Sequence, residues 1–163
     1  MEPERILELE GFLPYRLYHV ADLVSREFAS IYKDRFGLTR PEWRVLAGLG
    51  QHGAMTATRL GEQSAMHKTK VSRAVAELER RRWLLRTPDE SDRRVEHLTL
   101  TRAGLSAYRE MVPLAREFER RLSAAMSSER FVEFAHGLER LEAFVLGGLH
   151  KTGQATGRPL TNP

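Results

Sequence analysis

The chain of 163 residues contains no cysteine, and this absence removes several classes of chemistry at once. Without thiols a chain has no disulfide bonds, thiolate zinc sites, iron–sulfur clusters, cysteine nucleophiles or thiol redox sensors. A reducing compartment is compatible with such a composition, and we expect a cytoplasmic protein.

Long apolar runs are missing as well. No stretch of about 18 uncharged apolar residues occurs, so we expect no membrane-spanning helix and no membrane partner. The first residues, MEPE, are acidic and are not followed by an apolar segment, so the sequence predicts no secretory signal. With 41% hydrophobic and 29% charged residues and a mean hydropathy of −0.45, the composition is that of a folded globular chain.

Clusters of catalytic or metal-binding residues are also lacking. The six histidines include no pair four residues apart and no HExxH motif, which argues against a metal site. No GxSxG elbow or other nucleophile arrangement occurs, so we expect no enzyme and no cofactor. Residues 48–53, GLGQHG, match GxGxxG by count, but the residues before them predict a helix where a dinucleotide site needs a strand. We expect them to end a helix and form a turn.

Apolar residues recur at spacings of three and four along most of the chain, which predicts six helices. A Thr-Arg-Pro sequence at 39–41 marks the start of the second helix, and Thr101 the start of the fifth. Pro113 predicts a kink in the fifth. The helices are expected at about 13–37, 40–50, 56–63, 67–81, 101–125 and 128–149. Residues 1–10 are expected to be a flexible lead and residues 150–163 a disordered tail.

Two short segments between the fourth and fifth helices have the pattern of strands. Residues 83–86 are apolar, residues 95–100 alternate with Leu98 and Leu100 on one face, and the charged loop between them is rich in turn formers. Two antiparallel strands around such a loop form a hairpin, or wing. The expected fold class is therefore mainly α with a small β-hairpin wing.

The order of elements predicts a winged helix-turn-helix core at 38–100, flanked by long helices at 11–37 and 101–149. One small winged domain cannot bury the apolar faces of all the flanking helices, so we expect these to form a homodimer. A symmetric dimer suits palindromic double-stranded DNA, because two recognition helices can then read two half-sites.

Basic residues are concentrated between 67 and 86, where seven bases and two acids give a formal charge of +5, more than the +4 of the whole chain. If Val71 faces inward, Arg73 lies on the opposite side of the fourth helix. Free N–H groups in the first turn of that helix favour a phosphate. The predicted DNA contacts on this helix are His67, Lys68, Thr69, Lys70, Ser72, Arg73 and Arg80.

Two alternatives remain at this point. The basic helix can be an ordinary solvated face with charge pairs four residues apart, or the chain can be a winged-helix module that binds a protein and not DNA. An interaction module would show an apolar outer face on the fourth helix, and the sequence places bases there.

The wing adds Arg93 and Arg94 at or near its tip, where an arginine can enter the narrow minor groove. Asp92 repels phosphate, so we expect it to hold an arginine or to bond the backbone of its own turn. The alternative is a charged loop that only keeps the protein in solution.

Three segments, in this order and spacing, resemble the MarR family of bacterial transcription regulators. They are LTRPEWRVL at 38–46, KTKVSR at 68–73 and DESDRR at 89–94, the last followed by LTLTRAG at 98–104. The resemblance covers about residues 11–148. It implies a triangular homodimer held by the first, fifth and sixth helices, with recognition helices in successive major grooves and wings in the minor groove. It also implies a repressor that a small molecule releases.

Three positions depart from the family pattern. Arg82 stands where a glycine usually ends the recognition helix, which predicts a different closure or strain of about 1 kcal/mol. Ala65 replaces a turn glycine. His67 replaces an aspartate, which weakens the helix cap but removes a charge that would repel phosphate.

The resemblance also places a ligand pocket near the point where the first two helices meet the fifth. His19 and Arg26 on the first helix, with Trp43 and Arg44 on the second, are the candidate ligand-binding residues. An aromatic wall with a cationic head suits an aromatic carboxylate or an acyl-CoA as inducer. The alternatives are Trp43 in the core, His19 as a satisfied interior histidine and Arg44 in a surface ion pair.

Overall fold

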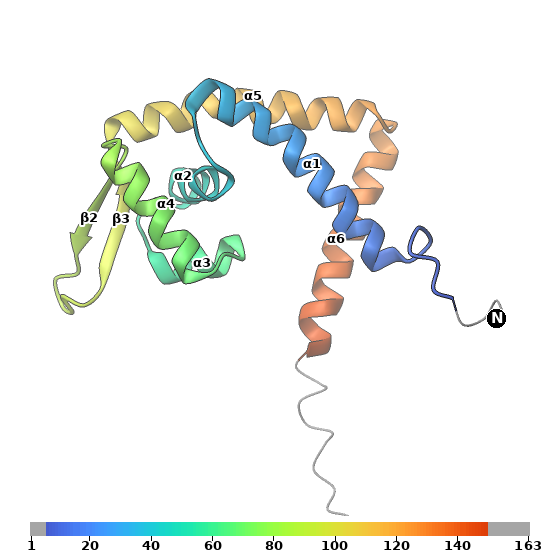
Figure 1. Ribbon diagram of the computed structural model, residues 1–163, viewed down its shortest axis with the longest axis horizontal. Helices are drawn as coiled ribbons and strands as arrows, with labels where there is room; N and C mark the ends of the chain where they lie inside the picture. The colour runs from blue at the N-terminus through green and yellow to red at the C-terminus, as the bar shows by residue number, and fades with distance from the viewer. Residues whose placement is uncertain (1–5, 150–163) are drawn as a thin grey trace, which may run out of the picture. The chain divides into compact units, whose positions relative to one another are not determined.

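The computed structural model describes residues 6–149, which contain six helices and three short strands (Figure 1). Residues up to Arg116 form one compact unit and residues from Glu117 a second. The expected fold class, mainly helical with a small sheet, is confirmed. The predicted tail at 150–163, and part of the lead predicted at 1–10, lie outside the described residues.

The first helix, α1, spans Leu13–Phe36, as the apolar spacing predicts. It ends at Gly37, whose φ of +62° lies in the left-handed region that glycine adopts without a steric penalty. The N–H of Gly37 donates to the carbonyl of Lys33 at 2.8 Å. This turn leads directly into the second helix.

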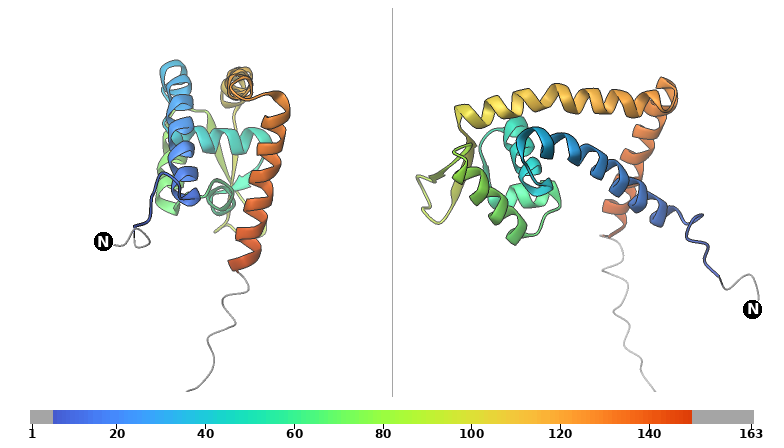
Figure 2. Two further views of the ribbon diagram at one scale, coloured as in Figure 1. Left: turned by 90° about the vertical axis from the view of Figure 1, so that its right-hand side faces the viewer. Right: turned by 45° about the horizontal axis from the view of Figure 1, so that its top comes forward.

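Helices α2, α3 and α4 form the helix-turn-helix core and pack together beside the β-hairpin (Figure 2). They span Arg40–His52, Ala57–Ser64 and Lys68–Arg80. At the start of α2 the N–H of Thr39 donates to the Glu42 carboxylate at 3.0 Å. The fully buried side chains shared by these helices include Leu46, Leu49, Leu60, Val71, Val75 and Leu78.

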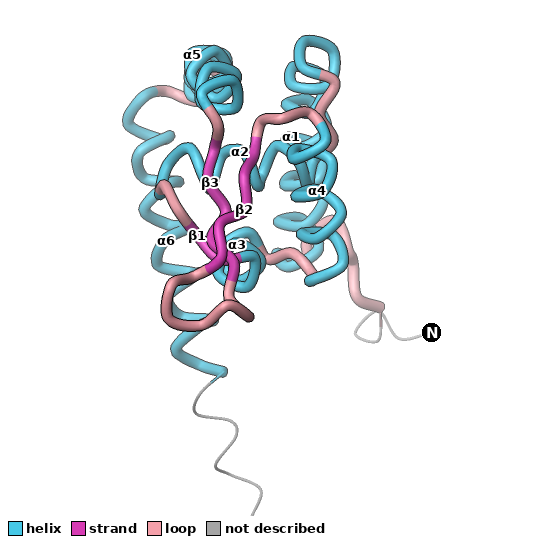
Figure 3. Tube along the Cα trace, turned by 90° about the vertical axis from the view of Figure 1, so that its left-hand side faces the viewer, coloured by secondary structure: helices cyan, strands magenta, loops and turns pink. Residues whose placement is uncertain are grey.

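The sheet has the strand order β1-β3-β2 (Figure 3). Strands β2, Leu84–Pro88, and β3, Glu96–Leu100, form the predicted antiparallel hairpin, in register from Leu84 opposite Leu100. The third strand, β1, is only Met55–Thr56 and pairs with β3. It has no sequence prediction, because two residues are too few to display an alternating pattern.

Helix α5 spans Arg102–Ala124 and begins at Thr101, whose hydroxyl accepts the N–H of Gly104 at 3.1 Å as the predicted cap. The helix continues through Pro113, and the kink expected there stays a prediction. The apolar spacing of this helix predicts a stripe that is buried at Phe118 and half-buried at Leu105, Tyr108, Val112, Ala115 and Leu122. Ala107 and Met111, which lie beside that stripe, are also buried.

The second unit is built on α6, Ser128–Leu149, together with the end of α5. The hydroxyl of Ser127 accepts the N–H of Arg130 at 3.4 Å, so the predicted start is confirmed. Its apolar residues are mostly exposed, Phe144 at 76% most of all. Between residues 6 and 149 no helix is both long and apolar enough to cross a membrane.

Candidate nucleic-acid interface

The N-terminal end of α4 presents unbonded backbone N–H groups. His67 is the N-cap, with an extended backbone and no hydrogen bond from its side chain to the first turn. The weak cap expected from this histidine is therefore present. Because the first turn of any helix has N–H groups without intrahelical acceptors, this end of α4 can accept an external anion.

The outward face of α4 carries the side chains predicted for it. Val71, Val75 and Leu78 are buried on the inner side. Lys68, Lys70 and Arg73 form no ion pair and no side-chain hydrogen bond with any described residue, so their charges are available to a partner. The residues of α4 that are exposed as predicted are Lys68, Thr69, Lys70, Ser72, Arg73, Ala76 and Arg80.

Arg80 is exposed but not free, which corrects the simple picture of a uniformly basic helix. Its guanidinium holds the Glu77 carboxylate with two hydrogen bonds, of 2.8 and 2.7 Å. Hydrogen bonds from Arg80, and then from Arg81, lower the pKa of Glu77 from 4.5 to about 2. Arg86 is likewise paired, with Glu79 at 3.1 Å and Glu96 at 3.0 Å.

The alternative of a helix with paired charges therefore holds for the C-terminal half of α4 and fails for its N-terminal half. Glu77 lies three and four residues before Arg80 and Arg81, the spacing at which side chains meet on a helix. The unpaired positive charge is consequently concentrated at the first two turns, next to the free N–H groups. That is the part of the helix that can approach a polyanion most closely.

The wing tip is exposed and is built around Asp89. One oxygen of this carboxylate accepts the N–H groups of Ser91 at 2.8 Å and Asp92 at 3.1 Å, and the other lies 2.8 Å from Nε2 of His97. The hydrogen bonds from Ser91, and then from His97, lower the pKa of the Asp89 carboxyl. The tip is thus fixed by one side chain that crosses from the loop to β3.

Asp92 takes the second of its two predicted roles, since its carboxylate accepts the N–H of Arg94 at 3.0 Å. Arg93 and Arg94 are exposed and unpaired among the described residues. Neither Asp89 nor His97 was predicted from the sequence. An aspartate two residues before a serine is a signal for the turn, but the pairing with His97 depends on strand register.

Two residues without the freedom of glycine adopt left-handed backbone conformations here. Ala65 has φ +49° in the turn before α4, and Arg82 has φ +59° after it. The N–H groups of Arg82 and Trp83 donate to the carbonyls of Glu79 and Leu78, which closes α4 in the usual way. Of the two possibilities for Arg82, the structure shows strain with the normal closure.

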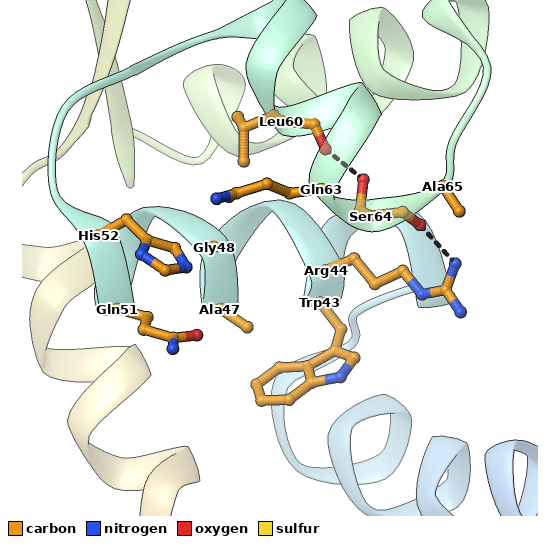
Figure 4. Close-up of a pocket in the computed structure, with 10 residues that line it drawn as sticks. All are labelled: Trp43, Arg44, Ala47, Gly48, Gln51, His52, Leu60, Gln63, Ser64 and Ala65. Atoms are coloured by element: carbon orange, nitrogen blue, oxygen red, sulfur yellow. Dashed lines mark hydrogen bonds between the residues drawn. The ribbon is translucent and has the colours of Figure 1, made fainter. Parts of the chain in front are cut away.

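A cavity of about 540 Å³ lies between α2, α3 and the turn after α3 (Figure 4). The pocket was predicted where the first two helices meet the fifth, but none of the residues that line this cavity belongs to α1 or α5. Trp43 and Arg44 both line it, and Arg44 also donates a hydrogen bond of 3.0 Å to the carbonyl of Ser64. The ring of Trp43 packs against Phe28 and Tyr32 of α1, so Trp43 belongs to the core as well. Polar side chains that line the cavity are Gln51, His52 and Gln63.

His19 and Arg26 are not brought to this cavity. The ring of His19 stacks on Tyr15, with ring centres 6.2 Å apart, and Arg26 pairs with Asp22 at 3.1 Å. Both side chains are exposed on α1. Because helical spacing places residues on a face but does not say what that face meets, the sequence could not separate them from Trp43 and Arg44.

The GLGQHG segment lies in α2 and the turn after it, as predicted. A Cβ atom added to Gly50 would lie 2.4 Å from the ring of Tyr108, and one added to Gly48 would lie 2.8 Å from Leu60. These glycines therefore permit close packing of α2. In the described part of the chain, no three His, Asp or Glu side chains gather as a metal site would require.

Comparison with known proteins gives a consistent result. The model of the MarR family matches residues 38–95. The HTH-type transcriptional repressor MdtR of Bacillus subtilis (strain 168) is 26% identical over 103 residues, which span 63% of this chain and 66% of that protein, just under two thirds of its length.

Two solved structures are similar over most of the chain. The MarR family transcriptional regulator SPO1453 from Silicibacter pomeroyi DSS-3 is 30% identical, with a TM-score of 0.76, and the match covers 86% of this chain and 99% of that one. A structure of Bordetella bronchiseptica BpsR, described as regulated in its DNA binding by 6-hydroxynicotinic acid, is 22% identical, with a TM-score of 0.75 and coverage of 84% and 97%. The second shows likeness of fold alone.

Proposed function

The chain belongs to the MarR family of transcriptional regulators, and from this premise we propose that it is a homodimeric repressor that binds palindromic double-stranded DNA. One observation carries the proposal. Lys68, Lys70 and Arg73 lie exposed and unpaired on the outer side of α4, beside its uncapped N-terminus. The description of the B. subtilis relative as a repressor supports the sign of regulation.

In this proposal the N-terminal turns of α4 insert into the major groove. The guanidinium of Arg73 can donate two hydrogen bonds to O6 and N7 of a guanine, and Thr69 can bond a base edge. Lys68 and Lys70 then contact phosphates and set the register. The wing places Arg93 and Arg94 at the minor groove, where narrow A·T tracts concentrate negative potential.

The homodimer is supported by apolar side chains that the chain leaves uncovered on α1 and α6. Tyr18 is 75% exposed and Phe144 76% exposed. Isolated exposed apolar residues are ordinary, but a series along two long helices is typical of an interface. Further large apolar side chains exposed on these helices are Leu13, Tyr15, Val20, Leu23, Val132, Phe134, Leu138, Val145 and Leu146.

We propose that the cavity at Trp43 and Arg44 takes a small aromatic acid that releases the DNA. The cavity has an arginine and several polar side chains beside apolar ones, which suits a planar ring with a carboxylate. The regulation of B. bronchiseptica BpsR by 6-hydroxynicotinic acid supports this class of ligand. Titrating that acid and benzoic acid into a protein–DNA complex, with the variant Arg44→Gln beside wild type, tests the assignment.

The function is tested with a random duplex library from which the wild-type chain selects its preferred site. Arg73→Ala should weaken the selected duplex by about 1–3 kcal/mol and relax the sequence preference. Lys68→Ala should weaken all duplexes alike and reduce the salt slope by about one. Arg109→Gln, which removes an exposed charge from α5, is the matched control.

Two results would oppose the proposal. If wild type selects no duplex, the remaining reading is a winged-helix module that binds protein. If wild type selects a site and Arg73→Ala binds every duplex as tightly, then α4 is not the recognition helix.

A further inference from the structure

The run of three arginines at 80–82 has one member that differs from the other two. Arg80 is 72% exposed and, among the described residues, bonds only to Glu77 of its own helix, and Arg82 is exposed. Arg81, by contrast, has a side chain only 24% exposed and turned toward other elements. A half-buried arginine costs more free energy to desolvate than an exposed one, so its contacts must offset that cost.

Arg81 joins the end of α4 to the end of α1. Its Nη1 donates to the carbonyl of Phe36 and its Nη2 to the carbonyl of Gly37, both at 2.8 Å. Phe36 is the last residue of α1 and Gly37 caps it, at the end of the helix where carbonyl acceptors lack intrahelical partners and carry partial negative charge. The guanidinium therefore completes the hydrogen bonding of a helix that is distant in sequence.

The remaining contacts of Arg81 fix its own position. Nε donates to Glu77 at 2.9 Å, and the guanidinium lies 3.9 Å from the Glu42 carboxylate and 5.6 Å from the centre of the Trp83 ring. Glu42 is itself buried and bonded to the start of α2. The planar, five-donor head of an arginine can make such a set of contacts, whereas the single ammonium of a lysine cannot reach both carbonyls and Glu77 together.

We propose that Arg81 is a positioning residue, which sets the recognition helix α4 against the C-terminal end of α1 and thereby makes base reading specific. The proposal rests on the proposed function, since α1 there belongs to the dimer and α4 to the DNA contact. The free lysines and Arg73 supply binding to any duplex, because charge attraction tolerates a small tilt of the helix. Base-edge hydrogen bonds do not tolerate such a tilt. The loss of Arg81 should therefore lower the affinity for the selected sequence and leave the affinity for other duplexes unchanged.

The experiment compares the full-length wild type with Arg81→Gln and Arg81→Lys on two duplexes, one selected by wild type and one of scrambled sequence, over a range of salt. Arg81→Gln should weaken the selected duplex about tenfold and leave the scrambled duplex and both salt slopes unchanged. The affinity of Arg81→Lys for the selected duplex should lie between those of wild type and Arg81→Gln. Arg109→Gln is the control for charge alone. Thermal unfolding and stoichiometric titration with the selected duplex normalise each sample to its folded, binding-competent fraction.

Two other outcomes overturn the inference. Equal loss on both duplexes with a salt slope reduced by about one makes Arg81 a phosphate contact. Wild-type affinity on both duplexes makes it a stabilising residue only, whatever the unfolding temperature. If Arg81→Gln does not fold, the same comparison is made with Arg81→Lys, which keeps the charge. If wild type itself selects no site, the proposed function fails and not the role of Arg81 within it.

Discussion

At the scale of single residues, Arg82 shows that a helix can form its usual closing hydrogen bonds at a residue other than glycine. Its φ of +59° is the conformation that glycine adopts freely and that crowds the Cβ atom of other residues. The resemblance to the MarR family indicated an unusual helix end at this position, because a glycine usually stands where this chain has Arg82. Whether the backbone would relax or accept the strain depended on hydrogen bonds from 82 and 83 that only the structure shows.

Arg82→Gly should therefore stabilise the chain by about 1 kcal/mol, because it removes left-handed strain and breaks no side-chain hydrogen bond or ion pair with residues 6–149. Urea denaturation measures the difference in free energy of unfolding. Arg73→Gly is a matched control with the opposite sign, since Arg73 is exposed inside α4 and glycine inside a helix costs about 1 kcal/mol. Equal or lower stability of Arg82→Gly would show that the arginine side chain contributes more than its backbone costs.

Glu77 gives a second residue-scale prediction, in acid. Its pKa is lowered from 4.5 to about 2 in the folded chain, so its ion pairs stabilise the fold fully above about pH 4.5. That contribution is lost as the pH falls toward 2, because the unfolded chain then binds the proton more readily. In Glu77→Gln the unfolding temperature should fall less steeply as the pH drops through this window. If it falls as steeply as in wild type, Glu77 is not the group responsible.

Glu133→Gln is the control for Glu77. Glu133 is exposed on α6 and has no ion pair with any described residue. The unfolding temperature of this variant should fall with decreasing pH as it does in wild type.

At the scale of elements, long periodic segments were predictable and short or paired ones were not. The apolar spacing predicts the extent of both α1 and α4, although only α4 has a continuous buried side and α1 buries Tyr32 alone. The stripe of α5 was predicted, but the further residues buried beside it were not, since the sequence does not say which side the neighbouring elements cover. The outward direction of Arg73 was predictable from the helical period. The pairing of Arg80 with Glu77 was not, because it depends on side-chain conformations that only the structure gives.

The wing offers the element-scale test. Asp89→Asn removes the charge that receives the bond from His97 and weakens the bonds from Ser91 and Asp92. Amide hydrogen exchange at the tip should become faster, and affinity for the selected duplex should fall by roughly threefold to tenfold, because Arg93 and Arg94 are less ordered. Glu90→Gln, whose carboxylate forms no hydrogen bond among residues 6–149, should exchange like wild type.

Similar exchange at the tip in Asp89→Asn and Glu90→Gln would show that the backbone of the hairpin alone orders the wing. In that case the bonds from Asp89 contribute little to the order of the loop.

At the scale of the whole molecule, the exposed apolar side chains on α1 and α6 are the surface that the proposed homodimer would cover. The sequence indicated the need for a second copy, because one winged domain is too small to cover the long helices. It could not identify the residues left bare, which depend on how each helix packs within its own unit.

Phe144→Asp should accordingly shift the protein from dimer to monomer in sedimentation at micromolar concentration. Burial of one phenylalanine contributes about 1.5–3 kcal/mol, and two copies are lost from a symmetric interface. His136→Asp adds a charge at an exposed polar position of the same helix and should remain dimeric. A wild-type protein that sediments as a monomer would remove the homodimer from the proposed function.

The two-residue strand β1 has a consequence for how the chain folds. The β2–β3 hairpin can form from neighbouring residues, but Met55 meets Leu98 only after the chain between them has folded back. Pairing of residues far apart in sequence requires closure of a long loop and slows folding. The winged sheet should therefore gain its third strand late, after α2, α3 and α4 have packed. Protection of the Met55 and Leu98 amides in a pulse-labelling experiment would then mark the last step of assembly.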